Sequence, residues 1–265
     1  MIKNIKLFVN KNDESIKTAK LIKDKLFENG FIVDDTNYEL AIAVGGDGSF
    51  LRMVKNNNFN SDIYYIGINS GTLGFLQEVK VFEIDKFISE LRNNEYKVEE
   101  IGIQETMVNC EDGVSKFYSH NEIIIRDKNL KVVKLNICIN NDKVERFLGD
   151  GILIASSAGS TAHNLSYGGS IVFNTFTSLQ LTPMGPINSK VYRSLVNSII
   201  IPDKMDVTLT PEDGYRDLIV TVDGENKFYD NVFSITTKID SKKIKCLRLS
   251  HYSFPQKINE KLLTD

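Results

Sequence analysis

The chain has 265 residues, and its 32 lysines and arginines against 35 aspartates and glutamates give a net charge of -3. This length accommodates one or two domains with large cores. The near balance of charge gives no support to nucleic-acid or anionic-membrane binding. Three widely separated cysteines lack metal-ligand spacing, and the amino-terminal apolar run is short and broken by lysines. We therefore expect reduced cysteines, no signal peptide or membrane span, and a cytoplasmic protein.

The first hundred residues alternate strand and helix patterns. Ile16, Ala19, Ile22 and Leu26 share one helical face, and Gly30 follows as a stop signal. Such alternation is typical of a mainly parallel sheet with helices on both faces. The predicted strands are 5–9, 31–33, 40–44 and 63–69, and the predicted helices are 13–29, 49–56 with Ser49 as N-cap, and one around Phe82 to Leu91 that ends near Asn93.

After about residue 100, short β-type runs follow one another between turn pairs, a pattern that predicts an all-β domain. We divide the chain into an α/β domain (1–100), a β-rich domain (101–250) and a tail (251–265) that could pack back on the first domain. Helices are expected around 161–167 and 189–196, and a closing strand with a solvated basic face within 242–261. The expected strands are 106–108, 122–126, 132–139, 152–155, 199–201, 207–209, 218–222, 233–236 and 244–249, and the turn pairs are 112–113, 140–141, 213–214 and 223–224.

A glycine-rich turn, Gly45-Gly46-Asp47-Gly48, links a buried strand to a helix. Backbone N–H groups and the helix dipole at such a turn attract phosphate, whereas a carboxylate repels it. One interpretation is an ordinary tight turn in which Asp47 only caps the helix. The other is phosphoryl transfer to an alcohol: the turn holds phosphate, and Asp47 orients or deprotonates the hydroxyl or helps to hold Mg²⁺.

Two later stretches also place polar or aromatic groups at strand ends. In "GINSGTLGFL" (67–76), Phe75 could face an adenine ring or belong to the core. In "SHNEIIIRD", Asn121 and Glu122 stand at the mouth of an apolar strand, where a plain polar strand end is the alternative.

A third stretch, "GDGILIASSAGSTAHNLSYGG" (149–169), gathers small residues and hydroxyls where a helix begins, which favours an anion or a ribose. Asp150 could bind a ribose hydroxyl or belong to a simple Asp-Gly turn. His163, taken alone, fits a packed or surface histidine, and Asp223-Gly224-Glu225 fits a hairpin turn. The sequence has no P-loop, no Gly-x-Gly-x-x-Gly fingerprint and no His/Cys metal cluster.

Together the motifs "GGDGS", "GINSGTLGFL", "NE", the 149–169 stretch and "DGE" resemble the NAD kinases, over about residues 38–226 and in their short bacterial form. The first motif is shared with diacylglycerol- and sphingosine-type lipid kinases and, loosely, with phosphofructokinases, whereas the second and fourth are more specific. The resemblance implies an amino-terminal α/β domain, a β-sandwich-like carboxy-terminal domain, NAD bound between them, ATP with Mg²⁺ or another divalent cation, and a homodimer or homotetramer.

The resemblance also implies roles for residues. Asp47 corresponds to the acid that activates the 2′-hydroxyl of the adenosine ribose, and Tyr192 could reach a neighbouring subunit's site. The implied NAD- and ATP-binding positions are Gly45, Gly46, Gly48, Phe75, Asn121, Glu122, Asp150, Thr161, Ala162, His163, Asn164, Ser166, Gly185, Tyr192 and Glu225. Four departures from the family pattern bear on affinity and nucleotide preference: Ser49 for threonine, Leu148 for arginine, His163 for tyrosine and Glu225 for glutamine.

The sequence thus predicts a kinase that uses ATP and Mg²⁺ to phosphorylate the 2′-hydroxyl of the adenosine ribose of NAD, giving NADP, with Asp47 as general base. Two alternatives stay open at this stage. One is a lipid kinase that shares the first glycine turn, and the other is a sensor that binds a dinucleotide without phosphorylating it.

Overall fold

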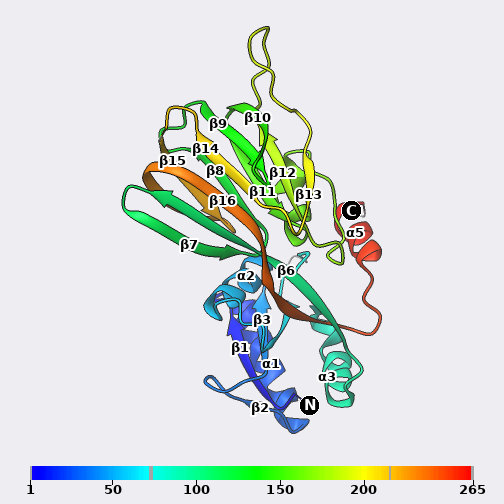
Figure 1. Ribbon diagram of the computed structural model, residues 1–265. Helices are drawn as coiled ribbons and strands as arrows, with labels where there is room; N and C mark the ends of the chain where they lie inside the picture. The colour runs from blue at the N-terminus through cyan, green and yellow to red at the C-terminus, as the bar shows by residue number, and fades with distance from the viewer. Residues whose placement is uncertain (1, 72–73, 215, 264–265) are drawn as a thin grey trace. The chain divides into compact units, whose positions relative to one another are not determined.

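The computed structural model describes residues 2–71, 74–214 and 216–263, and the chain divides into two compact units (Figure 1). The first unit comprises residues 1–101 and 243–265, and the second comprises residues 102–242. Two strands, β6 (Lys97–Cys110) and β16 (Glu225–Arg248), each have residues in both units. The carboxy-terminal segment that follows β16 therefore belongs to the amino-terminal unit.

The first unit is built on a parallel sheet with the order β2–β1–β3–β4, and β5 and residues 245–246 of β16 also pair with β4 in parallel. Because parallel strands place their carboxyl ends at one edge, the turns after β3 and β4 open on the same edge. The elements are β1 (Asn4–Val9), α1 (Asp13–Glu28), β2 (Ile32–Val33), β3 (Leu40–Gly45), α2 (Asp47–Asn56), β4 (Tyr64–Asn69), β5 (Val79–Lys80), the 3₁₀ turn η1 (Val81–Glu83), α3 (Ile84–Asn93) and α5 (Phe254–Leu262).

Helices α1 and α3 share one hydrophobic core with the sheet. Ile22 of α1 and Phe87 of α3 belong to the same buried cluster as Ile42 of β3. The alternation of side chains along β3 turns Ala41 and Ala43 away from that cluster, and α2 packs against β3 as well. Burial of each large apolar side chain is worth about 1.5–3 kcal/mol, so this core fixes β3 and the turn that follows it.

The second unit is a two-layer antiparallel sandwich. One layer has the order β13–β12–β11–β8–β15–β16, and the other contains β10–β9–β14–β16. Strand β16 joins both layers, since it pairs with β15 near its start and with β14 through Ile235–Thr237. The elements are β7 (Gly113–Ser119), β8 (Glu122–Asp127), β9 (Val133–Ile139), β10 (Asp142–Gly149), β11 (Gly151–Ser156), η2 (Ala158–Thr161), α4 (His163–Ser166), β12 (Ser178–Met184), β13 (Ile199–Pro202), β14 (Val207–Pro211) and β15 (Arg216–Val222).

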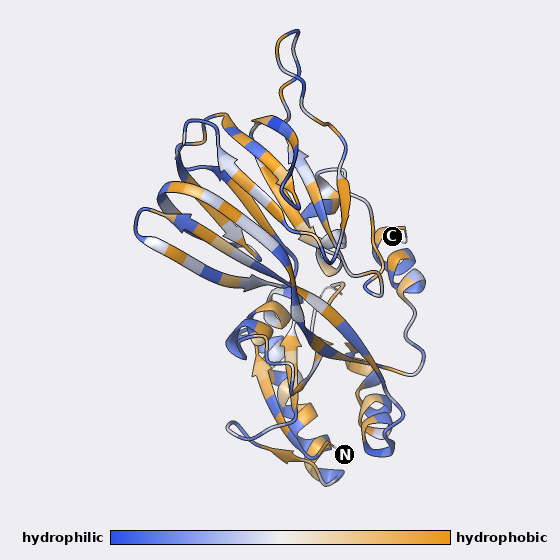
Figure 2. Ribbon diagram, in the orientation of Figure 1, coloured by the Kyte–Doolittle hydropathy of each residue, from blue (hydrophilic) through white to orange (hydrophobic). Residues whose placement is uncertain are grey.

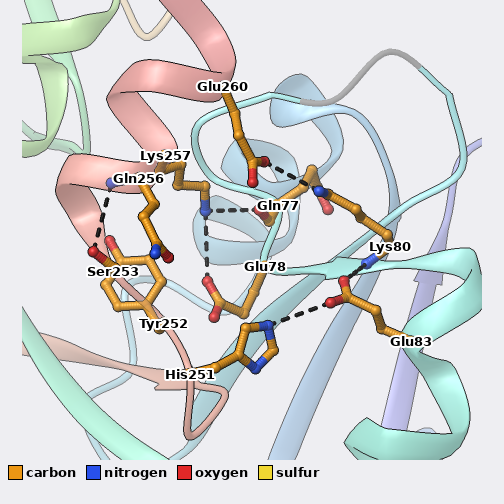
Figure 3. Close-up of a pocket in the computed structure, with 10 residues that line it drawn as sticks. All are labelled: Gln77, Glu78, Lys80, Glu83, His251, Tyr252, Ser253, Gln256, Lys257 and Glu260. Carbon is orange, nitrogen blue, oxygen red and sulfur yellow. Dashed lines mark hydrogen bonds and ion pairs between the residues drawn. The ribbon is translucent and has the colours of Figure 1, made fainter.

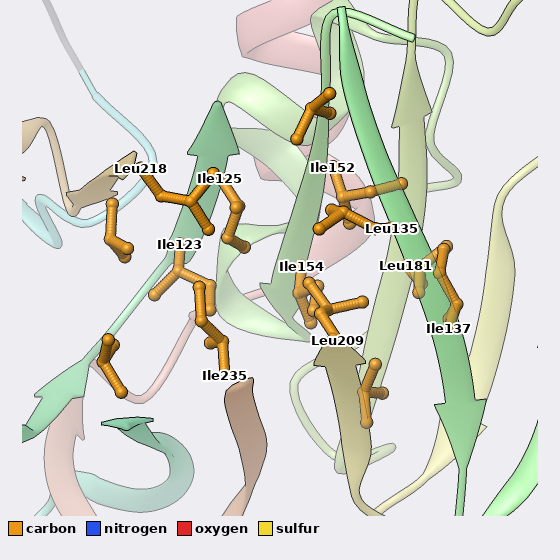
Figure 4. Close-up of a cluster of buried hydrophobic side chains, with 14 of the residues drawn as sticks. Ile123, Ile125, Leu135, Ile137, Ile152, Ile154, Leu181, Leu209, Leu218 and Ile235 are labelled. Atoms are coloured by element: carbon orange, nitrogen blue, oxygen red, sulfur yellow. The ribbon is translucent and has the colours of Figure 1, made fainter. Parts of the chain in front are cut away.

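The core of this unit lies between the two layers. Ile123 and Ile154 of one layer belong to the same cluster as Leu135 and Leu209 of the other, and Figure 4 shows these side chains gathered between the strands. Apolar and polar residues alternate along many of the strands in Figure 2, as in the buried-intermediate pattern of β14. The predicted fold class, an α/β domain with a mainly parallel sheet plus a β-sandwich-like domain, is confirmed.

The helix predicted at 189–196 is wrong, because this segment is irregular. The Ser189 hydroxyl accepts the N–H groups of Val191 and Tyr192, and the Asn188 side chain accepts the N–H of Ser194 at 2.8 Å. These short polar side chains satisfy backbone donors that a helix would otherwise bind, which is how such residues compete with helix formation.

Other boundaries also differ from the predictions. Helix α2 begins at Asp47 with Gly46 as N-cap, so Ser49 lies in the first turn and is not the cap. The two strands predicted at 233–236 and 244–249 are parts of the single strand β16, which ends at Arg248. Residues 254–262 form helix α5 instead of continuing a strand, and strands β7, β10 and β12 were not predicted. Two of the predicted turn pairs are confirmed: Asn140, Asn141, Asp223 and Gly224 all have positive φ, as two-residue hairpins require. The pair predicted at 112–113 is displaced by one residue, because Gly113 already belongs to β7 and pairs with Cys110.

Candidate active site

The first glycine turn follows β3 directly. Gly45 has a φ of +152°, and a Cβ there would lie 2.4 Å from the Ser49 Oγ, so the turn has no space for a larger residue. Gly46 has no described residue within 4 Å of its Cβ position, and Gly48 is exposed. The first N–H groups of a helix lack intrahelical acceptors and lie at its positive end, so the start of α2 is a suitable surface for phosphate.

The Asp47 carboxylate is held by the backbone of the turn that follows β4 in the 67–76 motif, which we call the second glycine turn. Its Oδ2 accepts the N–H of Phe75 at 2.8 Å, and its Oδ1 accepts the N–H of Leu76 at 3.0 Å. A Cβ at Gly74 would lie 1.9 Å from Oδ1, so the chain can approach this closely only at a glycine. Helix α2 has no side-chain capping bond, which does not support the interpretation that Asp47 only caps it. Each carboxylate oxygen still has a lone pair for a hydroxyl.

A further contact ties the two glycine turns together. The buried Gln77 side chain donates from Nε2 to the carbonyl oxygen of Gly46 at 2.8 Å. Phe75 is half-buried, and its proposed adenine contact stays a prediction. Thr72 and Leu73 of the "GINSGTLGFL" motif lie outside the described residues. Within the first unit, the structure thus brings the glycine turn, Asp47 and the Phe75 backbone together.

In the second unit, Asp223 organises the start of β8. Its carboxylate accepts the N–H groups of His120, Asn121 and Glu122, at 2.7, 2.7 and 3.2 Å. Asp223 lies in the β15–β16 turn with a φ of +46°, and its own N–H donates to the Glu122 carbonyl oxygen. The Asp-Gly pair is therefore a hairpin turn, and it also fixes the backbone that carries Asn121 and Glu122.

The side chains of Asn121 and Glu122 each have one buried oxygen that forms no hydrogen bond with a described residue. The Asn121 Oδ1 and the Glu122 Oε2 have no hydrogen-bond partner among the described residues. Burial, and then the charge of Asp223, raises the pKa of Glu122 to about 8, so its carboxyl is largely protonated at neutral pH. The His163 Nδ1 lies 3.7 Å from the Glu122 Oε1. Unpaired buried polar atoms are rare in proteins and point to a ligand or an ordered water.

The η2–α4 segment packs on this strand end. A Cβ at Gly159 would lie 2.0 Å from the Asn121 carbonyl oxygen. Asn164 is fully buried, and its Oδ1 accepts the hydroxyl of Thr182 at 2.7 Å while its Nδ2 donates to Gln180. The Asn164 side chain thus attaches the η2–α4 segment to β12. Of the other predicted positions here, Thr161 and Ala162 are half-buried, and His163 and Ser166 are exposed.

Asp150 and Gly185 lie together, since a Cβ at Gly185 would lie 2.3 Å from the Asp150 Oδ2. Tyr192 stacks on Arg146, whose guanidinium carbon is 5.0 Å from the ring centroid. Glu225 is exposed at the start of β16.

Sequence reasoning missed two contributors, the buried Gln77 and the organising role of Asp223. The Asp-Gly hairpin signal located the second, but nothing in the sequence marked the strand that it would contact.

Comparisons with known proteins agree with this fold. The ATP-NAD kinase N-terminal domain family matches residues 9–96, and the ATP-NAD kinase C-terminal domain family matches residues 120–243. The NAD kinase of Finegoldia magna is 43% identical to this chain over 239 residues, which cover 87% of each chain. The NAD kinase of Streptococcus pneumoniae is 34% identical over 263 residues, which cover 97% of this chain and 95% of the relative. The crystal structure of yeast NADH kinase complexed with NADH is similar to this chain with a TM-score of 0.86 at 20% identity, and the match covers 100% of this chain and 90% of that one. The crystal structure of an NAD kinase from Archaeoglobus fulgidus in complex with ATP has a TM-score of 0.72 at 20% identity, and the match covers 92% of each chain.

The family matches and the curated relatives make this chain a phosphotransferase with an alcohol acceptor, and the oriented Asp47 carboxylate in a glycine-rich turn fits that chemistry. More narrowly, the chain belongs to the NAD kinase family. The lipid-kinase and sensor alternatives find no support in these comparisons. Among the described residues, no helix is long and apolar enough to cross a membrane.

Proposed function

We propose that this protein phosphorylates the 2′-hydroxyl of the adenosine ribose of NAD with ATP, giving NADP. The observation that carries this proposal is the Asp47 carboxylate, which two backbone N–H groups orient beside a glycine turn suited to phosphate. A phosphate site alone needs no acid, whereas transfer to an alcohol gains from a fixed acceptor for the hydroxyl proton.

In the proposed mechanism, Asp47 accepts a hydrogen bond and then the proton from the 2′-hydroxyl as its oxygen attacks the γ-phosphorus. The bond to the β,γ-bridging oxygen breaks, and ADP leaves. The N–H groups of the glycine turn bind phosphate oxygens and keep the attack in line. Because Asp47 is already oriented by Phe75 and Leu76, little reorganisation is needed when the hydroxyl arrives.

Mg²⁺ or another divalent cation fits this donor set. Among the described residues, no group of three or more His, Cys, Asp or Glu side chains could hold a metal ion. Mg²⁺ is commonly bound by one or two carboxylates together with substrate phosphates and water, and Asp47 is the carboxylate that would serve here. When bound, the cation would neutralise charge that develops on the phosphates.

Asn121 and Glu122 are the proposed dinucleotide contacts of the second unit. Their unpaired buried oxygens can accept hydrogen bonds from a nucleotide, and the protonated Glu122 carboxyl can also donate one. The remaining proposed contacts are Thr161, Ala162, His163, Asn164, Ser166, Asp150, Gly185, Phe75 and Glu225.

We extend the proposal to a homodimer or homotetramer in which Tyr192 reaches a neighbouring subunit's site. We also place the protein in the cytoplasm. Its three cysteines form no disulfide, which fits a reducing compartment.

The function is tested by identifying the product. The protein is incubated with ATP and Mg²⁺ and either NAD or diacylglycerol vesicles, and the products are resolved by mass spectrometry and ³¹P NMR. We expect NADP with a 2′-phosphate and no phosphorylated lipid. Phosphorylated lipid, or NAD binding by calorimetry without NADP, would refute the proposal. Replacing ATP by polyphosphate, and NAD by NADH, defines the donor and acceptor range.

A further inference from the structure

Helix α5 packs a buried lysine against the second glycine turn. Lys257 is only 8% exposed, and its Nζ donates to the carbonyl oxygen of Gln77 at 2.8 Å. The same Nζ lies 3.5 Å from the Glu78 carboxylate (Figure 3). Burying an ammonium is costly unless it is paired and hydrogen-bonded, so both contacts are needed to keep it there.

The surroundings of Lys257 fix it on several sides. The Glu78 carboxylate also accepts the N–H of Leu249 at 3.1 Å and pairs with Arg248 at 3.3 Å. The Tyr252 ring centroid lies 5.3 Å from the Lys257 Nζ. Burial, followed by the charge of Arg248, lowers the pKa of Lys257 to about 8, whereas Glu78 and Asp47 act in the opposite direction.

Residue 77 connects Lys257 to Asp47. Its carbonyl oxygen accepts the lysine, and its side chain donates to the Gly46 carbonyl oxygen. The two residues before it, Phe75 and Leu76, donate their N–H groups to Asp47. We call residues 74–77 the Asp47 cradle. The cradle is thus bonded to the first glycine turn through Asp47 and Gly46, and to helix α5 through Lys257.

We propose that Lys257 is a positioning residue for Asp47: by holding the Gln77 carbonyl oxygen, it fixes the cradle whose N–H groups orient the carboxylate. This inference rests on the proposed function, because it assigns α5 a part in the same reaction. A reacting group displaced by about 1 Å can cost 10²-fold in rate. Loss of the lysine should therefore lower kcat far more than it weakens NAD binding.

The competing explanation is that Lys257 only stabilises the fold. The test compares Lys257→Met, which keeps the apolar stem, with Lys257→Arg, which keeps a charged donor. Ile22→Val serves as the control for stability, because Ile22 is fully buried in the same unit and lies outside the cradle. Steady-state kinetics, NAD calorimetry and amide hydrogen exchange at Phe75 and Leu76 are measured for each variant.

We expect Lys257→Met to lose about 10- to 100-fold in kcat with little change in NAD affinity. Exchange at Phe75 and Leu76 should become faster in this variant and not in Ile22→Val, and Lys257→Arg should recover part of both losses. Equal kcat and equal exchange in Lys257→Met and Ile22→Val would overturn the inference. If the wild-type protein makes no NADP, the proposed function fails, and the exchange data still decide whether Lys257 fixes the cradle.

Discussion

At the scale of single residues, two carboxyl groups are held in opposite ways. Asp47 accepts two backbone N–H groups, which suits an ionised acceptor. Glu122 is buried beside Asp223 with one oxygen unpaired among the described residues, and its pKa is raised to about 8. Their environments therefore fit different tasks: acceptance of a proton for Asp47 and hydrogen bonding to a nucleotide for Glu122.

Gly74→Ala tests the orientation of Asp47. The added Cβ would lie 1.9 Å from the Asp47 Oδ1, so the carboxylate must move. We expect a loss of about 10²-fold in kcat, measured as NADP formation, with NAD binding unchanged. Gly71→Ala is the matched control, because no described residue lies within 4 Å of its Cβ position. Equal activity of the two variants would show that the orientation is not important.

Glu122 predicts a pH dependence of stability. Its folded-state pKa of about 8 exceeds the ordinary value of 4.5, so the folded state binds more protons between these values. The free energy of unfolding should therefore decrease as pH rises from about 5 through 8, because Glu122 ionises more easily in the unfolded state. Urea unfolding at several pH values should show a smaller decrease in the free energy of unfolding for Glu122→Gln than for the wild-type protein. The exposed Glu225→Gln is the control, and the same decline in all three proteins would contradict the assignment.

At the scale of elements, the site depends on turns that contact strands remote in sequence. The β15–β16 turn places Asp223 where its carboxylate binds the backbone at the start of β8. The glycine turns after β3 and β4 hold each other through Asp47 and Gln77 in the same manner. In each case one side chain satisfies backbone donors or acceptors that would otherwise need water.

Asp223→Ala should loosen the start of β8. Three backbone N–H groups lose their acceptor, so we expect a destabilisation of about 1–3 kcal/mol in denaturant unfolding and weaker NAD binding in calorimetry. Asp213→Ala is the control, since Asp213 is exposed in the turn before β15. Unchanged NAD affinity in Asp223→Ala would show that this turn does not organise a nucleotide site.

At the scale of the whole molecule, the sequence predicted the two architectures because their periodicities differ: buried strands alternate with helices in one part, and short strands with Asx turns follow in the other. It also singled out Asp47 as the candidate catalytic residue, since a glycine turn after an apolar strand is a local signal. The cradle could not be predicted in this way. Gln77 and Lys257 contact partners at positions that only the folded chain brings together. The helix prediction at 189–196 was wrong for a related reason, because side-chain bonds from Asn188 and Ser189 replace those of a helix.

The central claim is that Asp47 accepts the proton of the attacking hydroxyl, and Asp47→Asn tests it most directly. Asparagine is nearly the same size as aspartate, but only one of its two terminal side-chain atoms is an oxygen that can accept an N–H group. Amide hydrogen exchange at Phe75 and Leu76 is therefore measured to check that the cradle is intact. NAD binding is measured by calorimetry and NADP formation by mass spectrometry. The account predicts NAD binding close to wild type and a loss of about 10² to 10⁴ in turnover. Turnover near that of the wild-type protein would contradict it.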